Sequence, residues 1–340
     1  MMRFSMRSKA TDPAARGAMY GALLDMASWS ETQGCIATVL SEHHAVDDGY
    51  LPSPVPLAAA IAARTSTMAI SVAALLLALY EPVKLAEDLA VVDLVSRGRV
   101  SYVIGIGYRD EEFDMFGVER RGRGRLVEER IRLLRRLWTG EAVELEGRRA
   151  RVTPLPYTPG GPMLAYGGGT EIAARRAARL GMFFIAENHA AELEAAYRAE
   201  AESTGVAALG CAFPTAGVPL TVFVADDPDR AWAEIGEYLL VDAKSYGQWN
   251  ANRQGIASVS FATTVDELKA ERGEYQIITP AEAASYVAQG VPLALQPLVG
   301  GIPTEIAWRY LETAAAAGNG SATASSSGAL DALSPKGLTR

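Results

Sequence analysis

The feature that most restricts the fold of this chain is a repeated order, in which a short apolar segment precedes a helical one. The helical stretches carry apolar residues three or four positions apart. Residues 35–40 and 68–77 lack polar alternation, as expected of parallel strands buried on both faces. The pattern predicts an α/β fold, a (β/α)8 TIM barrel. Its strands are expected at residues 3–7, 35–40, 68–77, 100–106, 163–165, 182–186, 218–225 and 293–298.

The length of 340 residues accommodates such a barrel as one domain, which we place at residues 1–318. Residues 143–152 predict a small hairpin inserted before the fifth strand. Residues 246–279 predict irregular structure with possible short helices, and we interpret them as an insertion or mobile lid before strand eight. Residues 319–340 are rich in Gly, Ser and Ala and predict a disordered tail.

Composition argues against several classes of protein. The chain has 32 basic and 40 acidic residues, a net charge of −8, which disfavours nucleic-acid binding. The longest apolar run, residues 68–79, is too short to span a membrane, and no signal peptide is visible. Two cysteines, Cys35 and Cys211, are too few for a disulfide framework. We expect a cytoplasmic protein that binds neither nucleic acid nor membranes.

Two of the three histidines, His43 and His44, follow Glu42 at the end of the second predicted strand. In a barrel, this is the end of the strands that carries chemistry. Adjacent strand residues face opposite ways, so one imidazole should enter the cavity and the other should face the barrel wall. Two further readings are a buried structural pair and a metal site with Asp47 and Asp48. Because neighbouring residues diverge, we predict no metal.

His189 follows the sixth predicted strand. At that position it either lines the cavity or lies at the surface.

Three consecutive glycines, residues 167–169, precede Thr170 at the start of a predicted helix. Glycine lets backbone N–H groups approach a ligand, and a helix N-terminus favours negative charge. The run is therefore a phosphate cradle or a simple flexible turn with an N-cap. We expect Glu171 to point outward.

A second glycine-containing run, residues 105–108, ends the fourth strand. Gly105 and Gly107 fit close backbone passage beside a flat ring, although an ordinary turn has the same pattern. Arginines at positions 120, 121, 123 and 125 form either an anion-binding patch or, as we prefer, a solvated face.

Four stretches in this order resemble the bacterial luciferase-like monooxygenase family. They are Glu42-His43-His44; Ala73-Ala74 followed by residues 81–88; residues 96–99 followed by residues 105–108 and Glu112-Phe113; and residues 167–170. The resemblance covers roughly residues 1–310. It implies an eight-stranded barrel that holds FMN or the deazaflavin F420 at its C-terminal face.

The resemblance also implies residue roles. His43 is the catalytic candidate, Glu42 contacts the ring edge or orients its neighbours, and His44 is structural. A non-proline cis peptide is implied within Val72–Leu75, with Ala73-Ala74 as the expected bond. Arg109 is the nearest candidate for an arginine that contacts the phosphate or the ring in some relatives. The implied cofactor-binding residues are Ala73, Ala74, Leu75, Gly105, Gly107, Tyr108, Tyr166, Gly167, Gly168, Gly169 and Thr170.

The function implied first is a monooxygenase that receives reduced FMN, from a separate reductase, and uses O2 to oxidise a small molecule. One alternative is F420-dependent hydride transfer on the same fold, and another is a non-catalytic flavin-binding subunit. Many family members form dimers, so a homodimer is expected, with the helices after strands two and three as interface candidates. The sequence does not identify the substrate.

Overall fold

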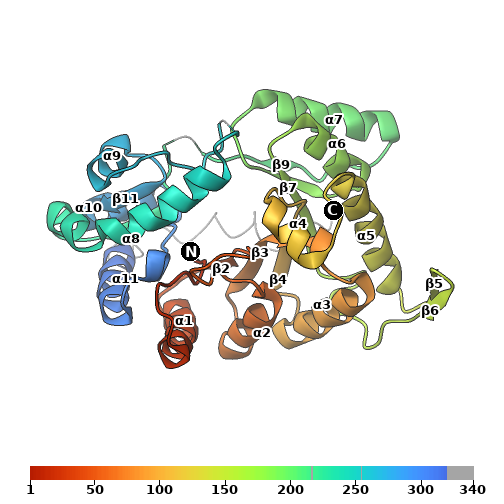
Figure 1. The fold of residues 1–340 in the computed structure, drawn as a ribbon, viewed down its shortest axis with the longest axis horizontal. Helices are drawn as coiled ribbons and strands as arrows, with labels where there is room; N and C mark the ends of the chain where they lie inside the picture. The colour runs from red at the N-terminus through yellow and green to blue at the C-terminus, as the bar shows by residue number, and fades with distance from the viewer. Residues whose placement is uncertain (216, 254, 320–340) are drawn as a thin grey trace.

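The computed structural model describes residues 1–215, 217–253 and 255–319. Its centre is a curled sheet of seven parallel strands, with helices packed around its outer side (Figure 1). The strands follow in space the order that they have in the chain, as successive βα units do. They are β1 (Met2–Phe4), β2 (Ala37–Leu40), β3 (Ala69–Leu76), β4 (Val100–Gly105), β7 (Met163–Gly168), β8 (Phe183–Ala186) and β9 (Cys211–Ala212).

The helices between these strands begin at strong local signals. Asp12 caps the first helix by accepting from the amide of Ala15, and Glu81 caps the third by accepting from the amide of Lys84. A proline occupies a first-turn position in both helices. The helices are α1 (Pro13–Thr32), α2 (Pro54–Arg64), α3 (Pro82–Ser96), α4 (Asp110–Phe116), α5 (Arg123–Leu137), α6 (Glu171–Arg179) and α7 (Ala191–Thr204), with a short 3-10 turn, η1 (Leu77–Leu79), after β3.

The rest of the described chain forms a second group of elements beside β1 (Figure 1). Strands β10 (Thr221–Val224) and β11 (Tyr275–Ile278) pair in parallel. Leu295 bridges both Met2 of β1 and Val222 of β10, and so joins this pair to the curled sheet. The helices of this group are α8 (Pro228–Trp249), α9 (Val265–Glu271), α10 (Pro280–Ala288) and α11 (Thr304–Asn319).

The predicted α/β fold with a curled parallel sheet is confirmed, but strand eight is not the extended strand expected at residues 293–298. Only the two bridges at Leu295 are present, and a 3-10 turn, η2 (Val299–Gly301), follows. Pro292 and Pro297 bracket the segment, and proline has no N–H group to donate to a strand ladder. The segment therefore pairs at a single residue.

Residues 246–279 were expected to be irregular with possible short helices, and this was wrong where α8 extends into the segment and where β11 forms, whereas the short helix α9 agrees with it. Helix α8 continues to Trp249, α9 begins with a capping box between Thr264 and Glu267, and β11 ends the segment. Helix α4 replaces the loop expected after the fourth strand, and β9 was not expected. The hairpin expected at residues 143–152 is present as β5 (Val143–Leu145) and β6 (Arg148–Ala150).

The remaining expectations concern the chain's end and membranes. Helix α11 ends at Asn319, so it includes the first residue of the expected tail, and residues 320–340 lie outside the described residues. Among the helices described, none combines the length and the apolar character that crossing a bilayer requires.

Candidate active site

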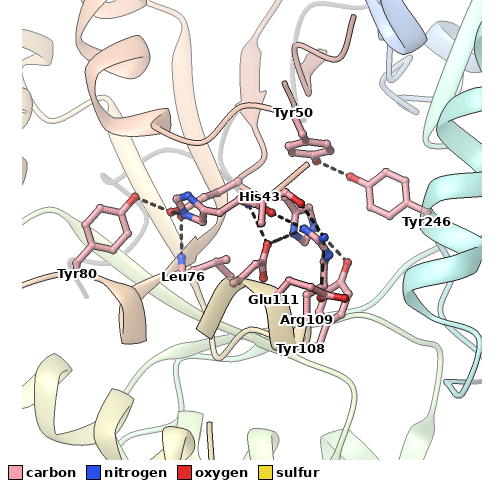
Figure 2. Close-up of polar contacts among 12 residues, drawn as sticks. His43, Tyr50, Leu76, Tyr80, Tyr108, Arg109, Glu111 and Tyr246 are labelled. Carbon is pink, nitrogen blue, oxygen red and sulfur yellow. Dashed lines mark hydrogen bonds and ion pairs between the residues drawn. The ribbon is translucent and has the colours of Figure 1, made fainter. Parts of the chain in front are cut away.

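The two histidines after β2 take different partners, as the alternation of side chains predicts (Figure 2). Nδ1 of His43 lies 2.7 Å from Oε1 of Glu112, and its Nε2 lies 3.1 Å from the hydroxyl of Tyr108. Nε2 of His44 lies 2.8 Å from Oε1 of Glu42. Both histidines are buried. The divergence therefore gives His43 and His44 separate hydrogen-bond networks.

Glu112, on α4, is the acceptor that fixes His43. Its Oε1 also accepts from the amide of His44 at 3.0 Å and from Arg109 at 3.4 Å. Burial raises the pKa of Glu112, but the bond from His43, the amide of His44 and the charge of Arg109 outweigh it and lower the pKa. An ionised Glu112 accepts only, so Nδ1 of His43 carries a proton, and Nε2 is directed at the hydroxyl of Tyr108.

Glu42 turns toward β3 and holds three donors. Its Oε2 accepts from the amide of Leu76 at 2.8 Å, and its Oε1 accepts from the hydroxyl of Tyr80 at 2.6 Å and faces His44 (Figure 2). Leu76 follows a bulge, because the register with β4 shifts between Ala73 and Leu75. Glu42 was expected either to contact the ring edge or to orient its neighbours. These contacts fit the second role, because Glu42 holds Leu76, Tyr80 and His44 in place.

The bulge in β3 contains the cis peptide bond Ala73-Ala74, as predicted. Both alanines and Gly105 of β4 are half-exposed, although they lie in central strands of the sheet. A Cβ atom on Gly105 would lie 2.8 Å from Cβ of Ala74, so only glycine fits there. These small residues form an accessible strip, which we call the shelf (Ala73, Ala74 and Gly105). Leu75 is fully buried beneath it.

The glycine run lies partly in β7 and not wholly in a loop. A Cβ on Gly168 would lie 2.6 Å from Cβ of Ala173, and one on Gly167 would lie 3.0 Å from Val103. Packing therefore already requires small residues here. All three glycines are nevertheless half-exposed, and the hydroxyl of Thr170 caps α6 by accepting from Ala173 at 3.2 Å. The run thus combines an accessible backbone with a helix N-terminus.

The surroundings of the run agree in part with expectation. Glu171 is exposed, as expected. Tyr166 is fully buried, with a hydroxyl that has no partner among the described residues. The carboxylate of Glu187 would lie 3.2 Å from a Cβ on Gly169, and it pairs with Arg253.

The four arginines expected to form one face divide into two pairs. Arg121 and Arg125 are exposed, whereas Arg120 and Arg123 donate to the carbonyls of Tyr108 and Gly107 at 3.2 and 3.0 Å, and Arg120 also pairs with the exposed Asp110 at 2.6 Å. Burial and the charges of Arg120 and Arg176 lower the pKa of Arg123. A concentration of positive charge therefore lies behind residues 107–108.

Helix α8 contributes site residues that sequence reasoning missed. The hydroxyl of Tyr246 lies 2.5 Å from that of Tyr50 (Figure 2), and the ring of Trp249 lies 4.8 Å from the ring of His43. Arg253, just after the helix, lies over the ring of Tyr108 at 5.0 Å. Tyr246 and Trp249 are three residues apart, a spacing that places them on one face of α8, and Arg253 follows four residues later, beyond the end of the helix. That spacing was the available signal.

A buried cation supports the same region. Arg7 donates to Asp48 at 2.6 Å and to Asp242 of α8 at 3.0 Å, and the hydroxyl of Tyr275 donates to Asp242 at 2.8 Å. The guanidinium lies 5.1 Å from the ring centre of Trp249. Arg7 thus links the segment after β1 to α8, and Asp48 is its second ion-pair partner.

Arg109 is held by backbone carbonyls, and His189 takes the surface position that was one of its two expected placements. Arg109 donates to the carbonyls of His44 and Ala45 at 2.6 and 3.3 Å and lies 4.5 Å from the ring centre of Trp249. Arg109 therefore belongs to the group of buried side chains around His43 and His44. His189 is exposed in the loop after β8, with its ring edge toward Phe213.

Comparison with protein families finds that residues 2–288 match the model of the luciferase-like monooxygenases. The chain is 25% identical over 145 residues to the oxygenase component of a flavin-dependent trigonelline monooxygenase of Acinetobacter baylyi, which covers 41% of this chain and 40% of that protein. It is 28% identical over 144 residues to the alkanal monooxygenase alpha chain of Photorhabdus luminescens, with the same coverage. The matches thus span less than half the length of these relatives.

Among solved structures, the fold resembles the oxygenating constituent of 3,6-diketocamphane monooxygenase from Pseudomonas putida, described as a type II Baeyer-Villiger monooxygenase in complex with FMN. The TM-score is 0.65 at 18% identity, and the match covers 92% of this chain and 95% of that one. This likeness concerns the fold.

Proposed function

Because this chain belongs to the luciferase-like monooxygenase family, we propose that it is an oxygenase that uses reduced FMN and O2 to oxidise a small organic molecule. The observation that carries the proposal is the placement of His43 Nε2, on an imidazole held by Glu112, at the C-terminal end of the curled sheet. The names of two relatives, an oxygenase component and a structure in complex with FMN, support FMN over F420. An oxygenase component also implies a separate reductase as partner.

The residues present fit a flavin mononucleotide. The shelf consists of small, accessible residues, and Gly105 has no room for a side chain, which suits the close approach of a planar ring. We assign the ring to the shelf, with Tyr108 at its side. The phosphate is assigned to residues 167–170, where glycine amides, a helix N-terminus and the charge of Arg123 favour an anion. Reduced FMN, when bound, supplies the electrons that activate O2.

The chain's own groups then have distinct tasks in this proposal. Nε2 of His43 takes or gives the proton that the oxidation requires, and Glu112 keeps the imidazole in the tautomer that leaves Nε2 free. Glu42 holds the shelf through Leu76. The rings of Tyr50, Tyr246 and Trp249 pack around His43 and keep water from the reacting atoms.

The proposal also covers the closure of the sheet and the oligomeric state of the protein. We infer that the strands close into a barrel, within one domain of residues 1–318, in which β10 and the segment at Leu295 serve as the seventh and eighth of the eight expected strands, and β9 and β11 are additional short strands. We also infer a homodimer that buries α3, because its Val91, Leu94 and Val95 are 47%, 39% and 46% exposed on one helix.

The experiment that tests the proposal is a titration of the purified protein with reduced FMN and reduced F420 under anaerobic conditions, followed by mixing with O2. We expect micromolar binding of reduced FMN, weak binding of F420, and an oxygen-dependent absorbance change that needs both protein and reduced FMN. Tight F420 binding with no FMN binding would refute the monooxygenase proposal. FMN binding without any reaction with O2 would favour a non-catalytic flavin-binding subunit.

A further inference from the structure

A cavity of about 230 Å3 lies away from His43 and His44, beside the N-terminal ends of β10 and β11. It is bounded by the loop after β8, the loop between β9 and β10, and the turn between α9 and β11. The residues on its walls that the argument needs are His189, Thr215, Val218, Leu220, Arg272 and Glu274. None of them belongs to the shelf, the glycine run or the partners of His43.

The walls of the cavity are mostly apolar, and the polar groups at its rim can donate hydrogen bonds. Val218 and Leu220, together with Pro214, supply the apolar part. Arg272 and the hydroxyl of Thr215 lie at the exposed rim, and both can donate hydrogen bonds. Arg272 forms no ion pair with any residue that the structure describes. The rim therefore presents donors and a positive charge to whatever enters.

Glu274 forms the buried side of the cavity. Its Oε1 accepts from Arg3 and from the hydroxyl of Thr221, each at 3.4 Å. Its Oε2 is buried and has no hydrogen-bond partner among the described residues. Burial is the largest influence on this carboxyl and raises its pKa to about 8, in spite of the opposing charge of Arg3. At neutral pH the group is therefore mostly protonated and is itself a donor.

We propose that this cavity is a second binding site, which takes a small, mostly apolar molecule carrying a carbonyl or carboxylate oxygen. The size suits a single substituted ring, because an apolar cavity of about 150 Å3 already binds benzene. The oxygen matches the donors of Thr215 and Arg272, and the ring matches Val218 and Leu220. The site goes beyond the proposed flavin chemistry and does not depend on it.

The test is ligand-observed NMR on the full chain without flavin, with acetophenone, benzoate and benzylammonium as probes of similar shape. Acetophenone and benzoate are expected to bind, and benzylammonium is not, since Arg272 repels it. Val218→Trp fills the cavity and should weaken both binders at least tenfold. Leu155→Trp, at a half-exposed leucine beyond the β5–β6 hairpin, is the matched control and should leave them unchanged.

A second variant tests the cavity even if Val218→Trp fails to fold. Arg272→Ala, at an exposed position, should weaken benzoate roughly threefold and acetophenone less, because only benzoate loses a charge pair as well as a hydrogen bond. The proposal is overturned if neither acetophenone nor benzoate binds at millimolar concentration, if Val218→Trp folds and binds them as wild type does, or if benzylammonium binds equally well. It is also overturned if FMN displaces the probes, because the cavity would then belong to the flavin site.

Discussion

Oε2 of Glu42 lies 2.8 Å from the amide nitrogen of Leu76, and this bond ties the end of β2 to β3 immediately after its bulge. The same carboxylate faces His44 and accepts from Tyr80. One buried side chain therefore supports both the shelf and the neighbour of His43. The proposed flavin surface and the histidine pair are held by a common group, and both should respond when it changes.

Glu42→Gln should destabilise the protein and weaken reduced FMN. A glutamine directs its NH2 group at one of three donors, which leaves a buried donor without an acceptor, at about 1–3 kcal/mol. Chemical denaturation gives the free energy of unfolding, and the titration gives the affinity. Glu144→Gln, at an exposed position of β5, is the control. An unchanged free energy of unfolding would contradict the role assigned to Glu42.

His43→Ala should lower the turnover of reduced FMN and O2 by about 10²–10⁴-fold, the usual contribution of a positioned general acid or base. Reduced FMN should still bind, because the shelf does not include His43. His44→Ala is the comparison: it removes the partner of Glu42 and should reduce stability more than turnover. Equal turnover in wild type and His43→Ala, with FMN bound in both, would show that another group moves the proton.

Glu112→Gln should lower turnover by roughly 10–100-fold through His43, while the chain remains folded. The carboxylate fixes the orientation of the imidazole, so its loss should lower kcat without weakening the binding of reduced FMN. Glu111→Gln, at the neighbouring exposed position, is the matched control. If Glu112→Gln lowered the free energy of unfolding but left the turnover of the folded protein unchanged, Glu112 would have a structural role alone.

Asp242→Asn should destabilise the protein by about 3 kcal/mol or more, because it leaves Arg7 with a buried, partly unpaired charge. Asp266→Asn, at an exposed position of α9, should have little effect. Since Asp242 and Trp249 belong to α8, the fluorescence of the variant should also report a changed environment of the tryptophans. If both variants unfold at the same denaturant concentration as wild type, the Arg7–Asp242 pair does not stabilise the fold.

Glu274 should make the protein less stable as the pH rises. Its pKa, about 8 in the fold, exceeds the ordinary value of 4.5, so the folded state holds a proton that the unfolded state has lost between these two values. Stability is full below about pH 4.5 and falls toward pH 8, by up to about 1.4 kcal/mol per pH unit. Melting temperatures from pH 5 to 8 should fall less steeply in Glu274→Gln than in wild type. Parallel slopes in the two proteins would contradict the raised pKa.

The sequence was sufficient for features that local rules determine. Apolar segments without alternation located the central strands, and the alternation of side chains separated His43 from His44. The cis bond at Ala73-Ala74 was predictable only through the family resemblance, because no propensity distinguishes two alanines in a strand. Strand eight was overestimated because an apolar run does not reveal that flanking prolines restrict pairing to Leu295.

What could not be predicted depends on contacts between distant parts of the chain. Glu112 was visible as part of a motif, but its bond to His43 depends on helix α4, which was expected to be a loop. Tyr246 and Trp249 lie within residues 246–279, where no regular helical pattern was recognised, so the helix face that they share was overlooked. Four-residue β11 was missed because so short a strand carries almost no periodicity.

The pairing of Arg7 with Asp242 has a consequence for the timing of synthesis. The two residues are 235 positions apart, and a ribosome that adds about 5–20 residues per second takes on the order of 10–50 seconds to make that stretch. Throughout this interval the nascent curled sheet carries a cation without its helix-borne partner. The emerging chain therefore passes through a period in which its first strands are complete but their polar interior is uncovered, which is when it most needs protection from aggregation.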